Sequence, residues 1–168
     1  MNKFLKFIDN FSEWTGRIFS WIIIIMTFLV VLEVIMRKFF NSPTIWSFEV
    51  TKQLYAFYFM IVAAYTLLYN AHVSVDVIYE KLSPKKQSIL DVISYIIFFF
   101  PFWIIIFIEG TKFAAKSWAI RETFVSVFAG PIYPIKTVIP VTALLILLQG
   151  IAIFIRKLHM AIKRETYG

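Results

Sequence analysis

The ionisable residues that could do chemistry gather around one uncharged run of the chain, residues 53–71. Glu49 precedes this run, and His72 and Asp76 follow it. Alternating valines would suggest a strand after residue 71, but an isolated strand there would leave its edges unpaired. In a helix that continues instead, the spacing of four puts the imidazole of His72 beside the carboxylate of Asp76. We expect that pair to stabilise the end of the helix and its contacts with a neighbour.

A second pair of charges lies earlier, where Glu33 interrupts an apolar run and Arg37 follows four residues later. An ion pair on one helical face near the membrane boundary is the simplest interpretation. The alternative is an ion-coupling carboxylate, because acids inside a membrane often have that role. A small exporter that works without partners would need such an acid, and Glu33 is the residue that could supply it.

The chain has two histidines, His72 and His159, and no cysteine. Two apposed imidazoles could hold a b-type haem, which leaves the membrane-anchor subunit of a respiratory enzyme, haem- or quinone-associated, as an alternative function. The absence of cysteine excludes disulfide chemistry, thiolate metal sites and iron–sulfur clusters. The sequence has no nucleophile with a base, no metal-ligand cluster and no phosphate-binding glycine loop. We therefore expect no enzyme activity and no catalytic, metal, substrate or cofactor site in this chain.

The composition identifies an integral membrane protein. Of the 168 residues, 60% are hydrophobic and 19% are aromatic, and the mean hydropathy is +0.78. A soluble domain of this composition would expose large apolar patches. The net charge of +7 is explained by basic residues kept on the cytoplasmic side and attracted to anionic membrane lipids, so no nucleic acid partner is needed.

Hydropathy predicts an all-α protein with four transmembrane helices in one membrane domain, residues 1–168. The predicted spans are residues 17–36, 50–71, 90–109 and 137–155. Residues 1–14 place aromatic and aliphatic side chains on one side and charged ones on the other, which predicts an interfacial amphipathic helix along the membrane surface. The first span lacks a small-residue cleavage site and is too long for a signal peptide, so we expect it to be retained.

The predicted helix of residues 50–71 has two specialised faces. Asn41-Ser42-Pro43 predicts its start, because Asn and Ser are favoured caps and Pro fits a first turn. On a 3.6-residue period one face holds alanines, which allow close packing and are explained most simply by contacts within the chain. Another face holds tyrosines, Tyr58 and Tyr65 among them, whose hydroxyls need partners that lipid does not provide. We expect a protein neighbour there.

The connections follow from breaker residues. Residues 83–86 predict a charged cytoplasmic loop, and Pro101 predicts a kink within the third span. Residues 111–122 predict a helical extension or a surface helix. Residues 124–132 are apolar but too short to cross a bilayer, so we expect a loop against the membrane or a partner.

The basic residues favour an orientation with both termini in the cytoplasm, because positive charge is retained there. Nine basic residues fall on the predicted cytoplasmic side: Lys3, Lys6, Lys81, Lys85, Lys86, Arg156, Lys157, Lys163 and Arg164. Six fall on the other side: Arg37, Lys38, Lys112, Lys116, Arg121 and Lys136.

The order of these motifs resembles one family. Arg37, a short turn, Trp46-x-x-Glu49, an apolar helix and Ala71-His72-Val73-x-Val75-Asp76 are similar to the DctQ-type small membrane subunit of tripartite ATP-independent periplasmic (TRAP) transporters. The segment from Gly130 to Lys136 is similar to one branch of that family. The resemblance covers nearly the whole chain and depends on the order of short motifs around one span.

The resemblance implies a small accessory subunit in the bacterial inner membrane. A large multi-span permease subunit would hold the substrate and sodium sites, and a periplasmic solute-binding protein would deliver an organic anion. This chain would brace the fixed scaffold and carry no cofactor. Signature positions and the tyrosine face together give the candidate subunit-interface residues: Arg37, Trp46, Glu49, Tyr58, Tyr65, His72 and Asp76.

Overall fold

The computed structural model describes residues 2–69 and 82–162, and its regular elements in those two ranges are helices. They are α1 (Asn2–Phe19), α2 (Ile22–Phe39), α3 (Ser47–Leu68), α5 (Pro84–Ser94), the π-helical turn η1 (Tyr95–Phe99), α6 (Phe100–Ala119) and α7 (Tyr133–Ile162). The all-α prediction is confirmed for this part of the chain.

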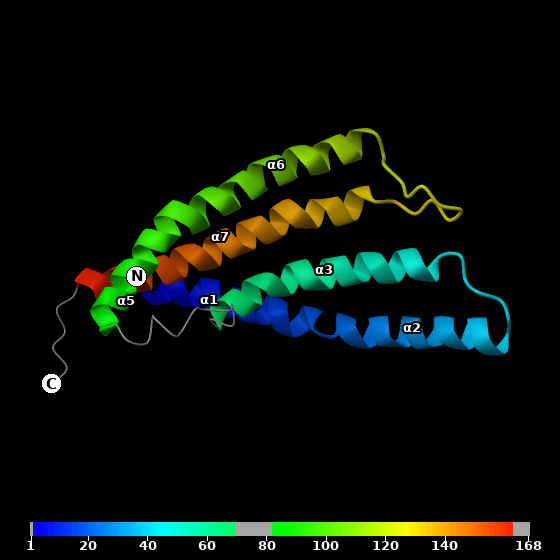
Figure 1. The fold of residues 1–168 in the computed structure, drawn as a ribbon, viewed down its shortest axis with the longest axis horizontal. Coiled ribbons are helices and arrows are strands. Elements are labelled where there is room, and N and C mark those ends of the chain that lie inside the picture. Colours follow the sequence, from blue (N-terminus) through cyan, green and yellow to red (C-terminus); the bar gives the residue numbers. More distant parts are fainter. Residues whose placement is uncertain (1, 70–81, 163–168) are drawn as a thin grey trace.

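The helices share one long axis and form an elongated bundle (Figure 1). Helices α2 and α3 are antiparallel neighbours, α3 lies against α7, and α7 lies against α6. The start of α1, the start of α5 and the end of α7 lie at one end of the bundle. The α2–α3 and α6–α7 connections lie at the opposite end, which we call the hairpin end (Figure 1).

The packing centre is α7 rather than the motif-bearing helix α3. Helix α7 contacts α1, α3, α5 and α6. Its buried residues are Val138, Pro140, Thr142, Ala143, Ile146, Gln149, Gly150, Ala152 and Ile153. Small side chains allow the close approach: a Cβ on Gly150 would lie 2.2 Å from a ring carbon of Phe99. Leu67 and Ala63 of α3 pack on the Ile146 side of this core, which agrees with an alanine face used within the chain.

Three described helices are long and apolar enough to cross a membrane: Leu5–Phe39, Lys86–Ala119 and Tyr133–Ile162. The first two expose most of their apolar surface, as a lipid environment allows, whereas half of the most apolar part of the third is buried inside the bundle. The predicted span at 50–71 is not among them. Its described helix contains Lys52, Gln53 and several tyrosines, which lower its mean hydropathy.

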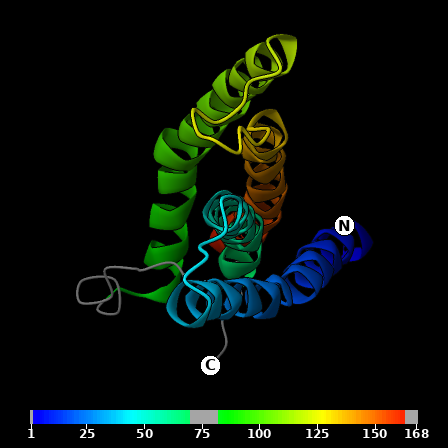
Figure 2. The same cartoon turned by 90° about the vertical axis from the view of Figure 1, so that its right-hand side faces the viewer.

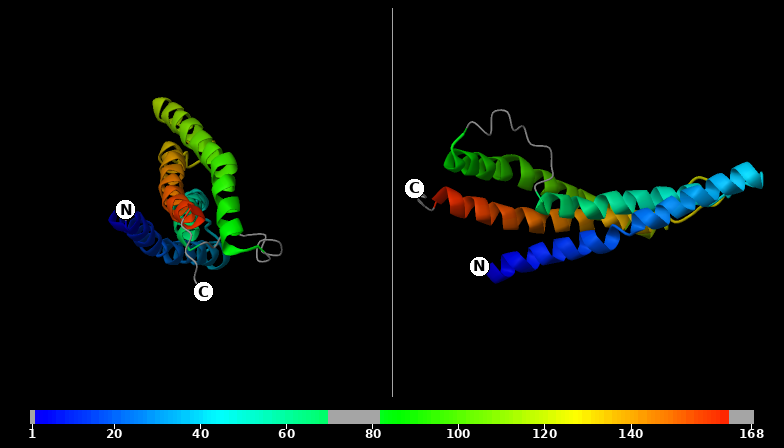
Figure 3. Two further views of the ribbon diagram at one scale, coloured as in Figure 1. Left: turned by 90° about the vertical axis from the view of Figure 1, so that its left-hand side faces the viewer. Right: turned by 90° about the horizontal axis from the view of Figure 1, so that it is seen from below.

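A separate interfacial helix at the N-terminus is not confirmed. Helix α1 extends to Phe19, beyond the predicted end at residue 14, and α2 continues nearly the same direction after a break at Ser20 and Trp21 (Figure 3, right). The side of α1 that carries Leu5 and Ile8 packs on Ala152 of α7.

Two helix starts differ from the prediction. Asn41 has φ of 48°, and the N–H of Ser42 donates to the carbonyl of Met36 at 3.1 Å, so these residues end α2 instead of starting α3. Asn tolerates the left-handed conformation that closes a helix, which is why the segment caps the preceding element. Helix α3 begins after Trp46. Pro84 likewise lies in the first turn of α5, where proline fits, so residues 84–86 are helical rather than loop.

The kink predicted from Pro101 is present as a π-helical turn. Residues Tyr95–Phe99 form this turn directly before Pro101, which lies in the first turn of α6. Proline removes a backbone donor and crowds the preceding turn, and a wider turn absorbs that mismatch. Figure 2 shows the resulting change of direction between α5 and α6.

The α6–α7 connection at the hairpin end agrees with the sequence. Helix α6 extends to Ala119, which confirms the predicted helical extension, and residues 120–132 form a loop with one isolated bridge between Thr123 and Pro131. The predicted helical continuation through His72 and Asp76 lies outside the described residues.

Candidate functional site

The site is built around Glu49, which lies in the first turn of α3 and is only 6% exposed. A carboxylate at this position is stabilised by the positive end of the helix dipole. It accepts hydrogen bonds from the hydroxyl of Ser126 and from the N–H of Gly130, the latter at 3.2 Å. Glu49 therefore attaches the α6–α7 loop to the start of α3.

The loop that Glu49 holds is itself ordered by backbone hydrogen bonds. The N–H of Phe124 donates to the carbonyl of Gly130 and that of Ile132 donates to the carbonyl of Glu122, both at 2.9 Å. The amide of Gln53, one turn after Glu49, donates to the carbonyl of Pro131 at 3.0 Å. Two successive turns of α3 therefore hold the returning strand of the loop.

Gly130 is required by a close approach. A Cβ there would lie 2.9 Å from Oε2 of Glu49 and 3.0 Å from the ring of Phe128. Any larger residue would push the loop away from the carboxylate. The same loop presents Val125 and Val127 outward, both almost fully exposed.

A cation lies on each side of this loop. The ammonium of Lys52 lies 5.9 Å from the ring centre of Phe124. Lys136 pairs with Glu122 and lies 4.0 Å above the ring of Phe113. Hydrogen bonds from Lys136 and from Ser117 lower the pKa of Glu122 below its ordinary value. These contacts fix both bases of the loop.

Glu33 and Arg37 form the predicted pair, with Nη2 to Oε1 at 3.0 Å. The other carboxylate oxygen of Glu33, Oε2, accepts hydrogen bonds from the hydroxyl of Thr44 and from the N–H of Thr44, the latter at 3.3 Å. Glu33 thus ties the end of α2 to the connection that leads into α3. With both oxygens engaged, the structure favours the ion-pair interpretation of Glu33 over ion coupling.

The other predicted interface residues occupy different places. Trp46 occupies the N-cap position of α3 without a capping hydrogen bond from its side chain, and it is 37% exposed. Tyr58 is half-buried. Tyr65 fills the notch left by Gly16, where a Cβ would lie 2.3 Å from the ring. The protein neighbour expected for the tyrosine face is therefore, at Tyr65, helix α1 of the same chain.

Sequence reasoning missed a buried polar network at the other end of the bundle. The amide oxygen of Gln149, a fully buried residue, accepts from the hydroxyl of Ser12 at 2.8 Å, and its nitrogen donates to Asp9 at 3.1 Å. Arg156 pairs with the second oxygen of Asp9. The available signals were one amide inside an apolar span and an acid on an amphipathic helix, but nothing in the sequence joins residues 140 positions apart.

The adjacent cation, Lys157, pairs with Asp91 of α5 at 2.8 Å. Two consecutive basic residues of α7 therefore attach to two different helices. We call the Asp9–Ser12–Gln149–Arg156 group the α1–α7 network.

The histidines are not brought together by any described contact. His159 lies exposed in the last turn of α7, and His72, like Asp76, lies outside the described residues. Within residues 2–69 and 82–162 no three side chains of His, Cys, Asp or Glu form a group able to hold a metal ion. The polar groups at Glu33, Glu49 and Glu122 hold loops, so the site acts chemically as a set of anchors.

Comparison with known proteins gives one assignment. No curated protein sequence matches the chain. The family model of the DctQ component of tripartite ATP-independent periplasmic transporters matches residues 9–160, which includes every described helix wholly or in part. The chain belongs to this DctQ family, the DctQ component of TRAP transporters.

Proposed function

We propose that the chain is the small scaffold subunit of a sodium-coupled TRAP transporter that imports an organic anion. Its partners are a large multi-span permease subunit and a periplasmic solute-binding protein that delivers the substrate. The family match over residues 9–160 carries this proposal. The matched family is a transporter component and not an enzyme family, so we propose no catalytic role.

Several acidic side chains pair with groups of this same chain, and this supports a scaffold role without a substrate site. An anion inside the membrane needs helix N-termini, basic groups or coordinated ions to offset its desolvation. In the described part of the chain, the acids Asp9, Glu33, Glu49 and Glu122 are engaged by groups of this same protein. We place the substrate and sodium sites in the large subunit, and no cofactor in this one.

We further propose four membrane crossings, with α3 as the second and both termini in the cytoplasm. The start of α1 and the end of α7 lie at the same end of the bundle, as an even number of crossings requires (Figure 1). An uncharged stretch from Gln53 onward gives α3 enough apolar length when it packs beside α7. The hairpin end would then face the periplasm and the solute-binding protein.

The proposed interface with the large subunit includes Arg37, Trp46, Tyr58, His72 and Asp76. Glu49 and Tyr65 contact other parts of this same chain, since Glu49 holds a loop and Tyr65 fills the notch at Gly16. We propose that they support the interface indirectly, by fixing the shape of this subunit. Outward aromatic and aliphatic side chains of α2 and α6 supply further apolar surface for helix association or for lipid.

The test is purification of the tagged chain from its native membrane in mild detergent. We expect a larger membrane protein to co-purify. Changing Trp46 to Ala together with Tyr58 to Leu should lower recovery of that complex and the uptake rate, while the apparent substrate affinity of assembled complexes stays constant. Trp14→Ala, which removes an exposed tryptophan of α1, is the matched control. Normal assembly with much weaker substrate affinity would replace the scaffold proposal by a direct role in translocation.

The alternative of a haem- or quinone-associated anchor is not supported by the family assignment. An absorbance spectrum of the purified protein separates the two functions, because a b-type haem gives a visible band and a TRAP subunit gives none.

A further inference from the structure

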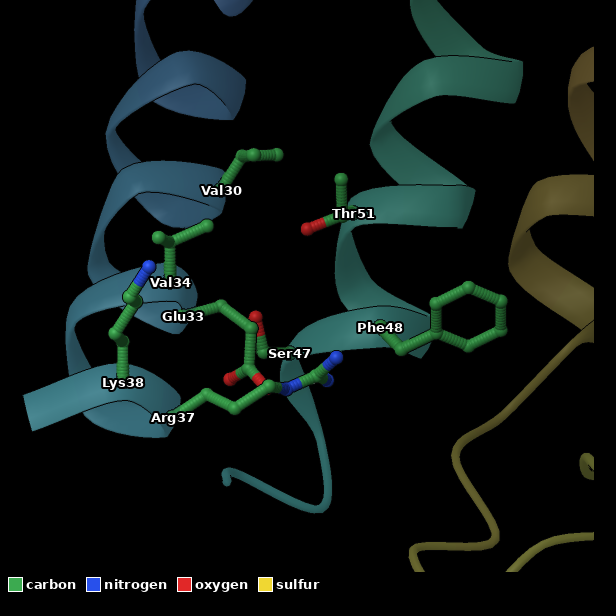
Figure 4. A pocket seen from close by; sticks show the side chains of 8 residues that line it. All are labelled: Val30, Glu33, Val34, Arg37, Lys38, Ser47, Phe48 and Thr51. Carbon is green, nitrogen blue, oxygen red and sulfur yellow. The ribbon is translucent and has the colours of Figure 1, made fainter. Parts of the chain in front are cut away.

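An open groove of about 410 Å³ separates α2 from α3 near the hairpin end. Its lining residues are Val30, Glu33, Val34, Arg37, Lys38, Ser47, Phe48 and Thr51. Figure 4 shows Val30 on α2 and Thr51 on α3 on opposite sides of the groove, with Glu33 and Arg37 below them. Lys38 extends along α2 beside Val34, and the ring of Phe48 points away from α2. Neither the family assignment nor the anchor contacts give this groove a role.

The groove changes from apolar to cationic along its length. Val30 and Val34 are about half exposed, and Phe48 is 74% exposed. Val30 precedes Arg37 by seven residues, which corresponds to roughly 10 Å along the helix axis. The apolar part therefore extends inward from the charged end by about the depth of a lipid glycerol region and the start of an acyl chain.

The charges at the groove do not cancel. Glu33 is matched by Arg37 and Thr44, and its side chain is 16% exposed. The side chain of Arg37 is 70% exposed, so most of its donors remain available. Lys38 is exposed and has no hydrogen bond or ion pair in the described part of the chain. One carboxylate faces two cations, which leaves a net positive charge.

We propose that this groove is a binding site for an anionic phospholipid. Its phosphate would bind Arg37 and Lys38, and one acyl chain would lie between Val30, Val34 and Thr51. Guanidinium groups match phosphate oxygens in a bidentate geometry, and basic pockets between membrane helices bind anionic head groups.

The groove fits a lipid better than a helix of another protein or a soluble anion. A soluble anion would not need the apolar walls. A helix inserted into the groove itself would bury Arg37 and Lys38 at a cost of desolvation that a lipid phosphate offsets by direct pairing. We therefore place the contact between Arg37 and the large subunit at the rim of the groove, with the lipid between the two proteins. The site lies at the end of a span, where head groups are located. The proposal requires only that α2 and its neighbours span a membrane, and it is independent of the transport function.

The test uses native mass spectrometry of the full chain purified in mild detergent, titrated with phosphatidylglycerol or phosphatidylethanolamine of the same acyl chains. The wild type should retain one phosphatidylglycerol in preference to phosphatidylethanolamine. Lys38→Gln should reduce this preference about fivefold, the effect expected for one basic residue near an anionic lipid. Arg37→Gln combined with Lys38→Gln should abolish it.

Two variants separate the site from general lipid association. Lys116→Gln removes an exposed cation elsewhere at the hairpin end and should leave the preference unchanged. Val34→Phe should fill the groove and weaken retention of both lipids without changing the charge. Equal retention of the two lipids by the wild type would overturn the proposal. Equal effects of Lys38→Gln and Lys116→Gln would also overturn it and identify unspecific annular lipid. Lys38 has no described ion pair to lose, so its variant should fold normally.

Discussion

A carboxylate joins separate elements at each end of the bundle, and the two differ in burial: Glu49 is 6% exposed, whereas the side chain of Asp9 is 24% exposed. At the hairpin end, Glu49 accepts from a hydroxyl and a backbone N–H, both neutral. In the α1–α7 network, Asp9 accepts from the guanidinium of Arg156 and from the amide of Gln149. One carboxylate holds a loop, and the other holds a helix.

The difference follows from what each carboxylate must position. Neutral backbone donors have fixed directions, so the Glu49 contact selects one loop conformation and requires glycine at 130. The guanidinium of Arg156 adds Coulombic attraction to its contact with Asp9, so the α1–α7 network depends on charge as well as on direction. We expect the hairpin end to depend on shape and the opposite end to depend on charge pairing.

The largest effect is expected for Glu49→Ala. The substitution leaves the N–H of Gly130 and the hydroxyl of Ser126 without their acceptor, and hydrogen bonds to a charged group contribute about 1.5–3 kcal/mol each. The loop should detach, which trypsin cleavage after Arg121 and a lower thermal unfolding midpoint would both report. Glu109→Ala is the control, because its pair with Lys112 is exposed and contributes about 1 kcal/mol or less. Equal protease resistance of Glu49→Ala and wild type would contradict the anchor assignment.

Gln149→Leu should come next, at about 1–3 kcal/mol in the free energy of unfolding. Leucine has a similar size but leaves the buried hydroxyl of Ser12 without a partner, and Asp9 loses one of two donors. The thermal midpoint in detergent measures the loss. Gln53→Leu is the matched control at the hairpin end, because the amide of Gln53 makes a single hydrogen bond in the described part of the chain and that bond is exposed. Equal losses of stability in the two variants would contradict the expectation that the buried amide of Gln149 contributes more than the exposed amide of Gln53.

The same comparison shows where sequence reasoning succeeded. Helical periodicity and hydropathy predicted the helices, and the spacing of four predicted the Glu33–Arg37 pair, because these signals are local. The kink at Pro101 followed from proline chemistry, but its form as a π-helical turn before the proline was not predicted. The loop predicted at 124–132 followed from its Gly and Pro residues, and in the structure it begins four residues earlier, at residue 120.

What the sequence could not supply was tertiary placement. Glu49 and Gly130 are 81 residues apart, and Asp9 and Arg156 are 147 apart, so no periodicity connects them. The motif around Trp46 and Glu49 suggested that α3 was the centre, whereas small residues at 143, 150 and 152 make α7 the packed core. The Asn41 segment was misassigned because the same residue type caps both ends of helices.

A smaller effect is expected for Gly130→Ala, which tests whether shape alone governs the hairpin end. The added methyl group would lie 2.9 Å from Glu49 Oε2, so the loop must shift by a few tenths of an ångström. The cost should be about 1–2 kcal/mol, since overpacking typically costs that much, and trypsin cleavage after Arg121 should rise without any change of charge. Gly168→Ala at the chain terminus is a control for the change of residue type. Unchanged cleavage of Gly130→Ala would show that the loop has room to adapt.

The smallest effect concerns Glu122, whose pKa is lowered by Lys136 and Ser117. A carboxylate whose pKa is lowered in the folded state stabilises the fold at any pH above its ordinary pKa of 4.5. That contribution is lost as the pH falls through the lowered pKa of the folded state. Glu122→Gln should therefore lower the thermal midpoint slightly at neutral pH, and the difference from wild type should shrink below pH 4.5 and vanish in stronger acid. Glu109→Gln, which alters an exposed pair, should show a smaller difference at neutral pH. A Glu122→Gln difference that stayed constant across the titration would mean that the contact with Lys136 acts through packing on Phe113 and not through charge.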